Sequence, residues 1–350
     1  MNLPVTNAIC GLATCLLVQS CGLPAPRLAY GTHAPSAPHE TRRCPWIPAV
    51  ASDWQRVYAP SNHRYLNDHT IVRGDDGRFH LYGITNVGAG DPQTEVSLLH
   101  ATASALTGPW REQADVFDAE RKMDERVLWA PYALNASPGH WLMYFWAGSR
   151  RTESTTRGLR MATSLDLDQW QRFGAMDHVD QRPRGGRDPF VLHTASGWLM
   201  YSVGVSPIEA SGLAHGRIVV SHSASPAKPR GWGEPVTVLE DPSENYPWGN
   251  LESPFVVSNV CGYYLFVTRT NRDAQTVDYD RTLVFFSSDP VHFEWRVLTE
   301  FRAHAAEIVD AGNGVEYVTS AGWPAVIGEA RRGLSVANLA WNPAPASAGR

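Results

Sequence analysis

The chain repeats one sequence pattern five times between residue 50 and the C-terminus, and this repetition limits the folds that it can adopt. Each copy begins with a short polar or proline-containing segment, here called the knot. An apolar stretch, a turn and a second stretch rich in aromatic residues follow. The knots read Asn67-Asp68-His69, Trp129-Ala130-Pro131, Arg187-Asp188-Pro189, Glu252-Ser253-Pro254 and His304-Ala305-Ala306-Glu307. Strand-type repeats of this length favour an all-β fold, the five-bladed β-propeller, with one blade per repeat.

A second repeat runs in step with the first, because a tryptophan marks the expected outer strand of each blade. The tryptophans are Trp54, Trp110, Trp170, Trp232 and Trp295, at steps of 56, 60, 62 and 63 residues. The fifth repeat lacks an outer strand at its C-terminal end, whereas residues 52–58 carry one ahead of the first repeat. We therefore expect residues 52–58 to close the ring in the last blade, which protects an open sheet edge. A β-sandwich of repeated hairpins is the alternative.

The N-terminal part differs in composition from the repeats. Residues 8–21 form an apolar run too short for a lasting membrane span, which is typical of a signal peptide. Val18-Gln19-Ser20-Cys21 resembles a bacterial lipobox, so lipid attachment at Cys21 to an envelope membrane and plain secretion, periplasmic or extracellular, are both open. The expected domains are a signal peptide at 1–21, a Pro/Ala-rich tether at 22–50, the catalytic propeller at 51–341 and a disordered tail at 342–350.

Charge and composition exclude some partners and favour others. A net charge of −5 without a basic patch argues against nucleic acid, and we expect a monomer. The 13 Trp, 12 Tyr and 11 Phe exceed what a minimal core needs, and aromatic rings suit sugar faces, although most should pack within blades. Cys44 and Cys261 lie outside the leader, and their pairing is left open. No CxxC or zinc-type spacing is present.

Three acidic residues stand in the knots, where the inner strands of a propeller begin. Asp68, Asp188 and Glu252 belong to repeats one, three and four, and the starts of inner strands converge on the central axis. Carboxyl groups held close together disfavour each other's ionisation, which suits acid/base chemistry. Glycoside cleavage needs two such groups, one to protonate the leaving oxygen and one to activate water or attack directly. For any single acid, the alternative is a turn cap or a solvated side chain.

These residues resemble the five-bladed β-fructosidase/arabinase superfamily, which comprises glycoside hydrolase families 32, 43, 62 and 68. The resemblance covers residues 50–341. Trp129-Ala130-Pro131 is similar to the Trp-Ala-Pro of family 43, and Arg187-Asp188-Pro189 is shared in style with families 32 and 43. The first knot has His69 where these families have proline, and the fourth has Ser253 where glycine or alanine is commoner. Both changes indicate a divergent branch.

The resemblance implies roles for individual positions. Asp68 would be the general base, or the nucleophile of a retaining relative, Glu252 the general acid, and Asp188 a group that assists Glu252 and binds the sugar. In family 43 arabinanases a histidine of the fifth blade lies beside a metal ion or water cluster, so His304 is the candidate neighbour of an axial Ca²⁺. No other metal or cofactor is expected. The expected substrate contacts are Arg187, His69, Trp129, His304 and Asn250, with one or two sugar-stacking rings among Trp129, Trp146, Trp248 and Trp323. The alternatives are that His69 packs under its strand and that His304 is a buried, hydrogen-bonded histidine.

The sequence thus predicts an exported glycoside hydrolase of plant-type or microbial poly- and oligosaccharides. Arabinofuranosides or xylosides are the preferred substrates. An inverting mechanism is favoured because the chain ends after the fifth blade, without the C-terminal β-sandwich of family 32. The alternatives are a fructan or sucrose β-fructosidase and, from another class, a non-catalytic sugar-binding propeller.

Overall fold

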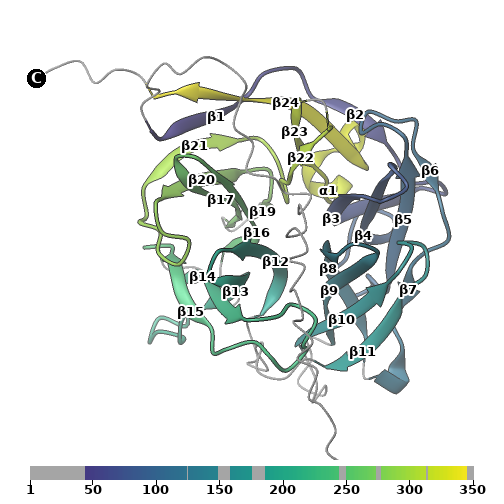
Figure 1. The fold of residues 1–350 in the computed structure, drawn as a ribbon, viewed down its shortest axis with the longest axis horizontal. Coiled ribbons are helices and arrows are strands. Elements are labelled where there is room, and N and C mark those ends of the chain that lie inside the picture. Colours follow the sequence, from purple (N-terminus) through teal and green to yellow (C-terminus); the bar gives the residue numbers. More distant parts are fainter. Residues whose placement is uncertain are drawn as a thin grey trace, which may run out of the picture.

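The computed structural model arranges five β-sheets as blades around a central axis (Figure 1), which confirms the predicted five-bladed β-propeller. It describes residues 44–123, 125–148, 158–175, 186–243, 250–272, 277–312 and 314–344. The predicted signal peptide, Cys21 and Trp248 lie outside these ranges. In the part of the chain that is described, no helix has the length and apolar character needed to cross a membrane.

The first four blades each contain antiparallel strands that follow one another along the chain from the axis outward. Nearly all residues of β9 are buried, because both faces of its sheet pack against neighbouring blades. The strands are β3 (Arg64–Arg73), β4 (Phe79–Val87), β5 (Ser97–Ala103), β6 (Arg111–Glu112) and β7 (Phe117–Asp118) in blade 1; β8 (Val127–Ser137), β9 (His140–Gly148), β10 (Gly158–Ser164) and β11 (Gln171–Ala175) in blade 2; β12 (Arg187–Thr194), β13 (Gly197–Val205), β14 (Gly216–Ser223) and β15 (Val236–Glu240) in blade 3; and β16 (Leu251–Asn259), β17 (Gly262–Arg269), β20 (Thr282–Ser287) and β21 (Val297–Phe301) in blade 4.

Blade 5 combines the two ends of the described chain. Its inner strands β22 (Ile308–Asp310), β23 (Glu316–Ser320) and β24 (Leu334–Pro343) come from the C-terminal side. Two N-terminal strands, β1 (Trp46–Val50) and β2 (Gln55–Tyr58), pair along the outer edge of β24. The predicted ring closure by residues 52–58 is confirmed through β2.

The expected tether is wrong at its C-terminal end, since residues 46–50 form β1 of the propeller. The Trp46 side chain is buried, and its backbone N–H donates a hydrogen bond to the Tyr264 hydroxyl at 2.8 Å. Cys44, just before this strand, forms a disulfide with Cys261, which settles their pairing and ties the closing strand to blade 4. At the other end β24 runs to Pro343, so the predicted tail at 342–350 begins too early.

The knots share one backbone feature, a single extra residue in the inner strand relative to its neighbour. In β8 the pairing shifts between Trp129 and Tyr132, and β3, β12 and β16 shift at the equivalent places. Such bulges re-aim side chains. Four knots carry a non-glycine residue with a φ of 46–56° at one shared position, namely Ala130, Asp188, Ser253 and Ala305. The sequence alignment of the knots is therefore also a structural alignment.

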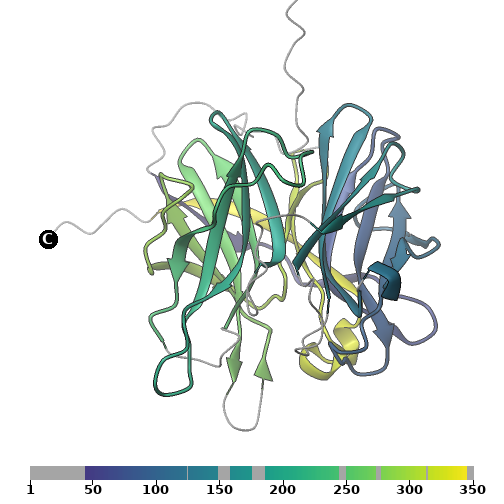
Figure 2. The ribbon, with the colours of Figure 1, turned by 90° about the horizontal axis from the view of Figure 1, so that it is seen from below.

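One face of the ring carries the short helix α1 (Pro324–Ile327) and the hairpin of β18 (Asn271–Arg272) and β19 (Val277–Asp278). Both project from the same side of the blades (Figure 2). The 3₁₀ turn η2 (Glu329–Arg331) follows α1, and η1 (Arg121–Met123) lies between blades 1 and 2. Helix α1 and the segment after β19 contribute residues to the end of the axis at which the knots begin.

Candidate active site

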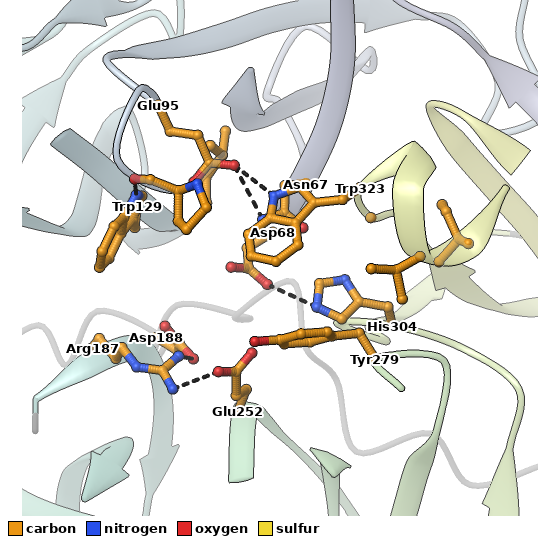
Figure 3. A pocket seen from close by; sticks show the side chains of 15 residues that line it. Asn67, Asp68, Glu95, Trp129, Arg187, Asp188, Glu252, Tyr279, His304 and Trp323 are labelled. Carbon is orange, nitrogen blue, oxygen red and sulfur yellow. Dashed lines mark hydrogen bonds and ion pairs between the residues drawn. The ribbon is translucent and has the colours of Figure 1, made fainter. Parts of the chain in front are cut away.

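An open pocket enclosing about 490 Å³ lies on the axis, at the end where the inner strands begin (Figure 3). All five blades contribute to its wall. Its polar and aromatic lining consists of Asn67, Asp68, Glu95, Trp129, Arg187, Asp188, Glu252, Tyr279, His304 and Trp323. The structure therefore brings together the three predicted acids, Arg187, Trp129 and His304, which are separated by more than two hundred residues of sequence.

Arg187 joins the acids of blades 3 and 4. Its Nη1 lies 2.7 Å from Asp188 Oδ2, and its Nη2 lies 2.6 Å from Glu252 Oε1. The side chains of both acids are nearly buried, so these charge-assisted hydrogen bonds replace much of their hydration. The backbone N–H of Ser253 donates a further hydrogen bond to Asp188 Oδ2 at 3.0 Å. Figure 3 shows the second oxygen of Glu252 turned away from Arg187, towards the middle of the pocket.

Asp68 enters the pocket from blade 1. Its nearest basic side chain is farther away than Arg187 is from Asp188 and Glu252. The Ser253 hydroxyl donates to Asp68 Oδ1 at 2.9 Å, and His304 Nε2 lies 3.8 Å from the same oxygen. Burial raises the pKa of Asp68 to about 6. The charges of Asp188 and Glu252 add to this rise, whereas His304 and the hydrogen bond from Ser253 oppose it. At neutral pH Asp68 is a carboxylate that accepts protons readily.

His304 stands before β22 and faces Asp68 from blade 5. Its Nδ1 lies 2.6 Å from the Ala321 carbonyl oxygen, so Nδ1 carries a proton and donates it to that oxygen. The other nitrogen, Nε2, faces the pocket and Asp68. The predicted neighbour of the axis is thus in place.

Glu95 was missed by the sequence reasoning, because it stands alone in the β4–β5 loop and has no counterpart in the other repeats. Its Oε1 accepts hydrogen bonds from Trp323 Nε1 at 2.7 Å and from the Tyr65 hydroxyl at 3.0 Å. Burial raises the pKa of Glu95 to about 7. Gly90 of the same loop has a φ of 110°, and a Cβ there would lie 2.6 Å from the Trp323 ring, so glycine allows this close contact.

Two predicted substrate contacts do not line the axial pocket. The Asn250 side chain is buried and donates to Asp241 Oδ2 at 2.6 Å, which fixes the connection between blades 3 and 4. His69 points the other way from Asp68, its Nε2 lying 2.8 Å from Thr319 Oγ1, and it lines a separate lower cavity of about 330 Å³. Burial lowers the pKa of His69 to about 3.

The predicted tryptophans divide between the pocket and the core. Trp323 and Trp129 line the pocket, although only 6% of Trp129 is exposed, and its indole N–H donates to the Pro92 carbonyl oxygen at 3.1 Å. Trp146 stacks behind Trp129, with ring centroids 4.6 Å apart, and packs in the core. Tyr279, after β19, lines the pocket and was not predicted, because it lies outside the repeated pattern.

The described axial residues do not form a calcium cage. Ca²⁺ takes six to eight oxygen ligands, whereas Asp188 and Glu252 are already engaged by Arg187, which leaves Asp68 as the carboxylate beside His304. Within the described ranges, the one group of three potential metal ligands in mutual reach is His80, His100 and Asp168, which lies off the axis. An axial Ca²⁺ stays a prediction.

Comparison with known proteins supports the fold. The sequence matches no established protein-family profile and no curated protein sequence. The structure is similar to an α-L-arabinofuranosidase from Lactobacillus brevis (TM-score 0.58, 16% identity, 81% of this chain and 94% of that one) and to a Bacillus subtilis arabinanase (0.55, 14%, 81% and 96%). It is also similar to a GH32 β-fructofuranosidase from Bombyx mori (0.57, 13%), covering 81% of this chain and 62% of the other. The predicted resemblance to this group of propellers is confirmed at the level of fold.

Proposed function

We propose that this chain is a glycoside hydrolase that cleaves arabinofuranosides or related pentosides in the axial pocket. The observation that carries the proposal is the convergence of Asp68, Asp188 and Glu252 from three blades in one open pocket, with Arg187 between two of them. A solvated trio of acids would not need a largely buried arginine bridge. Two carboxyl groups with different environments are what glycoside hydrolysis requires.

In the proposed inverting reaction Asp68 acts as the general base. Its carboxylate takes a proton from a water molecule whose oxygen bonds to the anomeric carbon, as the bond from that carbon to the leaving oxygen breaks. Glu252 acts as the general acid, giving its proton to the leaving oxygen through the carboxyl oxygen that does not contact Arg187. Solvent then removes the proton from Asp68 and returns one to Glu252.

The remaining pocket residues position these groups and the sugar. Arg187 holds Asp188 and Glu252 at a fixed separation, and its burial between them restricts both side chains. Asp188 offers its outer oxygen to a sugar hydroxyl. Trp323 supplies an aromatic wall, and Glu95 fixes that ring through its indole N–H. Rigid positioning of this kind contributes to rate by holding reacting groups in attack geometry.

The pentoside preference draws on the fold neighbours, which include an arabinofuranosidase and an arabinanase by name. A β-fructosidase is the second candidate, since a GH32 β-fructofuranosidase shares the fold. The two differ in the sugar released, so a single assay separates them.

The test is release of reducing sugar from arabinan, arabinoxylan, levan, inulin and aryl pentofuranosides. Wild type is compared with Asp68→Asn and Glu252→Gln, and with Glu294→Gln, an exposed acid away from the pocket, as the matched control. We expect pentose release that falls about 10²- to 10⁴-fold in the two pocket variants and stays unchanged in the control. Fructose release would instead support the second candidate function, a β-fructosidase. Glycan binding without turnover would refute catalysis and leave a sugar-binding propeller.

We also propose that the chain is exported and that Cys21 is either lipidated or removed with the leader. The Cys44–Cys261 disulfide supports export, because such bonds persist in oxidising compartments. Metabolic labelling with a palmitate analogue in a bacterial host, for wild type and Cys21→Ser, tests lipidation. Label in wild type alone supports the anchor, and label in neither supports plain secretion.

A further inference from the structure

A second cluster of titratable side chains lies at the border of blades 1 and 2, away from the axial pocket. His80 on β4 and His100 on β5 lie next to each other, with ring centroids 5.3 Å apart, and Asp168 reaches them from the β10–β11 turn. One ligand atom from each of the three lies within 4.8 Å of the others. None of them lines the axial pocket, and no sequence motif signals them, because they come from separate elements.

The two rings face each other through one nitrogen each. His80 Nδ1 and His100 Nε2 are 3.1 Å apart. A zinc ion bound at about 2.0–2.1 Å to two nitrogens with a tetrahedral angle holds them about 3.3 Å apart, so little movement separates the hydrogen-bonded pair from a metal-bound one. The ion would take the place of the proton that the two nitrogens now share.

The outer nitrogens of the rings face carboxylates. His80 Nε2 lies 3.6 Å from Asp76 Oδ2, and His100 Nδ1 lies 3.9 Å from Asp168 Oδ1. When the inner nitrogens bind a metal, each neutral ring carries its proton on the outer nitrogen. A carboxylate facing that outer N–H is the usual orienting partner of a metal-bound histidine, and Asp76 has this place beside His80. The Asp168 side chain is 49% exposed and would turn from His100 Nδ1 to the ion, as its third ligand.

Burial leaves both rings in the form that a metal needs. His80 and His100 are almost completely buried, and burial lowers the pKa of both, that of His100 to about 3, so both are neutral at physiological pH.

We propose that His80, His100 and Asp168 form a binding site for a divalent transition ion of the Zn²⁺ type, with Asp76 orienting His80. Imidazole nitrogens with a carboxylate suit Zn²⁺ rather than Ca²⁺ or Mg²⁺. The ion joins blade 1 to the β10–β11 turn of blade 2. It serves the stability of the ring rather than the reaction at the axis.

Arg78 is the competitor of the metal ion in this site. Its guanidinium lies 2.5 Å from Asp76 Oδ2 and 3.9 Å from Asp168 Oδ2, so it neutralises the same carboxylates. The Arg78 side chain is 44% exposed and can turn towards solvent when an ion binds. The site therefore predicts opposite effects for two kinds of substitution.

The test is equilibrium dialysis of the untagged, chelator-treated full chain against Zn²⁺, with metal counted by mass spectrometry, and visible absorption after Co²⁺ loading. We expect one ion per chain in wild type and about tenfold or more weaker binding in His100→Gln and His80→Gln. Arg78→Gln should bind several-fold tighter, and His292→Gln, an exposed histidine elsewhere, should match wild type. Asp168→Asn should also weaken binding. Because Asp168 is at an exposed position that tolerates change, this variant keeps the test valid when a histidine variant fails to fold. Absence of stoichiometric binding up to about 100 µM Zn²⁺, or equal binding by wild type and Asp168→Asn, would refute the site and leave a hydrogen-bonded histidine pair.

Discussion

Ser253→Ala tests how the pocket sets the protonation of Asp68. The Ser253 hydroxyl donates to Asp68 Oδ1 at 2.9 Å and stabilises the carboxylate form, which opposes the rise that burial causes in the pKa of Asp68. Alanine fits this backbone, because Ala130 and Ala305 occupy the same knot position with φ values of 46° and 49°. The substitution thus removes one hydrogen bond with little change elsewhere.

The size of the expected pKa change follows from the free energy that this hydrogen bond contributes. A hydrogen bond to a charged acceptor contributes about 1.5 kcal/mol, or about one pKa unit. The pKa of Asp68 should therefore rise from about 6 to about 7. If Asp68 is the base, kcat/KM falls as Asp68 becomes protonated, so activity at pH 6 should drop about fivefold while activity near pH 8.5 stays close to wild type.

The assay is the pH profile of kcat/KM on the substrate found in the panel, with ¹³C NMR of the Asp68 carboxyl as a readout independent of turnover. Ser258→Ala, the same substitution at the far end of β16, is the matched control and should leave the profile unchanged. An acid limb that does not move in Ser253→Ala would contradict the role of Asp68 as the base. So would an equal loss of activity at every pH.

Three further outcomes concern stability and are measured by urea unfolding. Cys261→Ser opens a disulfide that spans 217 residues, so the free energy of unfolding should fall by about 5 kcal/mol, and reductant should affect wild type but not the variant; an unchanged value would show that pairing with Cys44 adds nothing. Burial raises the pKa of Glu307 to about 8, so the buried charge costs stability increasingly as pH rises from the usual glutamate value to about 8. Glu307→Gln should therefore stabilise the fold by several kcal/mol at pH 8 and little at pH 4.5; a gain independent of pH would sink this explanation. Trp323→Phe removes a donor from Glu95, whose pKa burial raises to about 7, so it should cost about 1–3 kcal/mol at pH 8, where Glu95 is charged, and less at pH 5; equal costs would contradict it.

Most of the fold could be predicted from the sequence because each blade repeats the same local sequence pattern. The knots, the aromatic second strands and the outer tryptophans recur at nearly constant steps, so five weak signals support one another. Ring closure was predictable for residues 52–58, because a missing strand at one end matched an extra one at the other. The strand at 46–50 was not, since a Pro/Ala-rich composition there resembles a linker and only the pairing with β24 makes it a strand.

The pocket residues that stand in the repeated pattern could be predicted from the sequence, whereas those that come from loops could not. Asp68, Arg187, Asp188, Glu252 and His304 all stand in knots, and the pocket includes each of them.

Glu95 and Tyr279 come from loops without a counterpart in other blades, so no alignment within the chain could reveal them. Two polar neighbours of the knot acids that were expected to contact substrate, His69 and Asn250, do not line the pocket. His69 follows Asp68 and points to the opposite side, as successive residues of a strand do, and Asn250 is held by Asp241.

The repeated bulge explains why one pocket can collect so many functional groups. The residue just before the shared knot position lines the pocket in every blade, giving Asn67, Trp129, Arg187, Glu252 and His304 in turn. The backbone thus presents five equivalent positions around the axis, each occupied by a different type of side chain. Because the bulges are built by pairing within each blade, a change of side chain at one of these places alters the chemistry without altering the ring. The shared knot position adds further contacts: Asp188 binds Arg187, and the Ser253 hydroxyl donates a hydrogen bond to Asp68, which occupies the same position in blade 1.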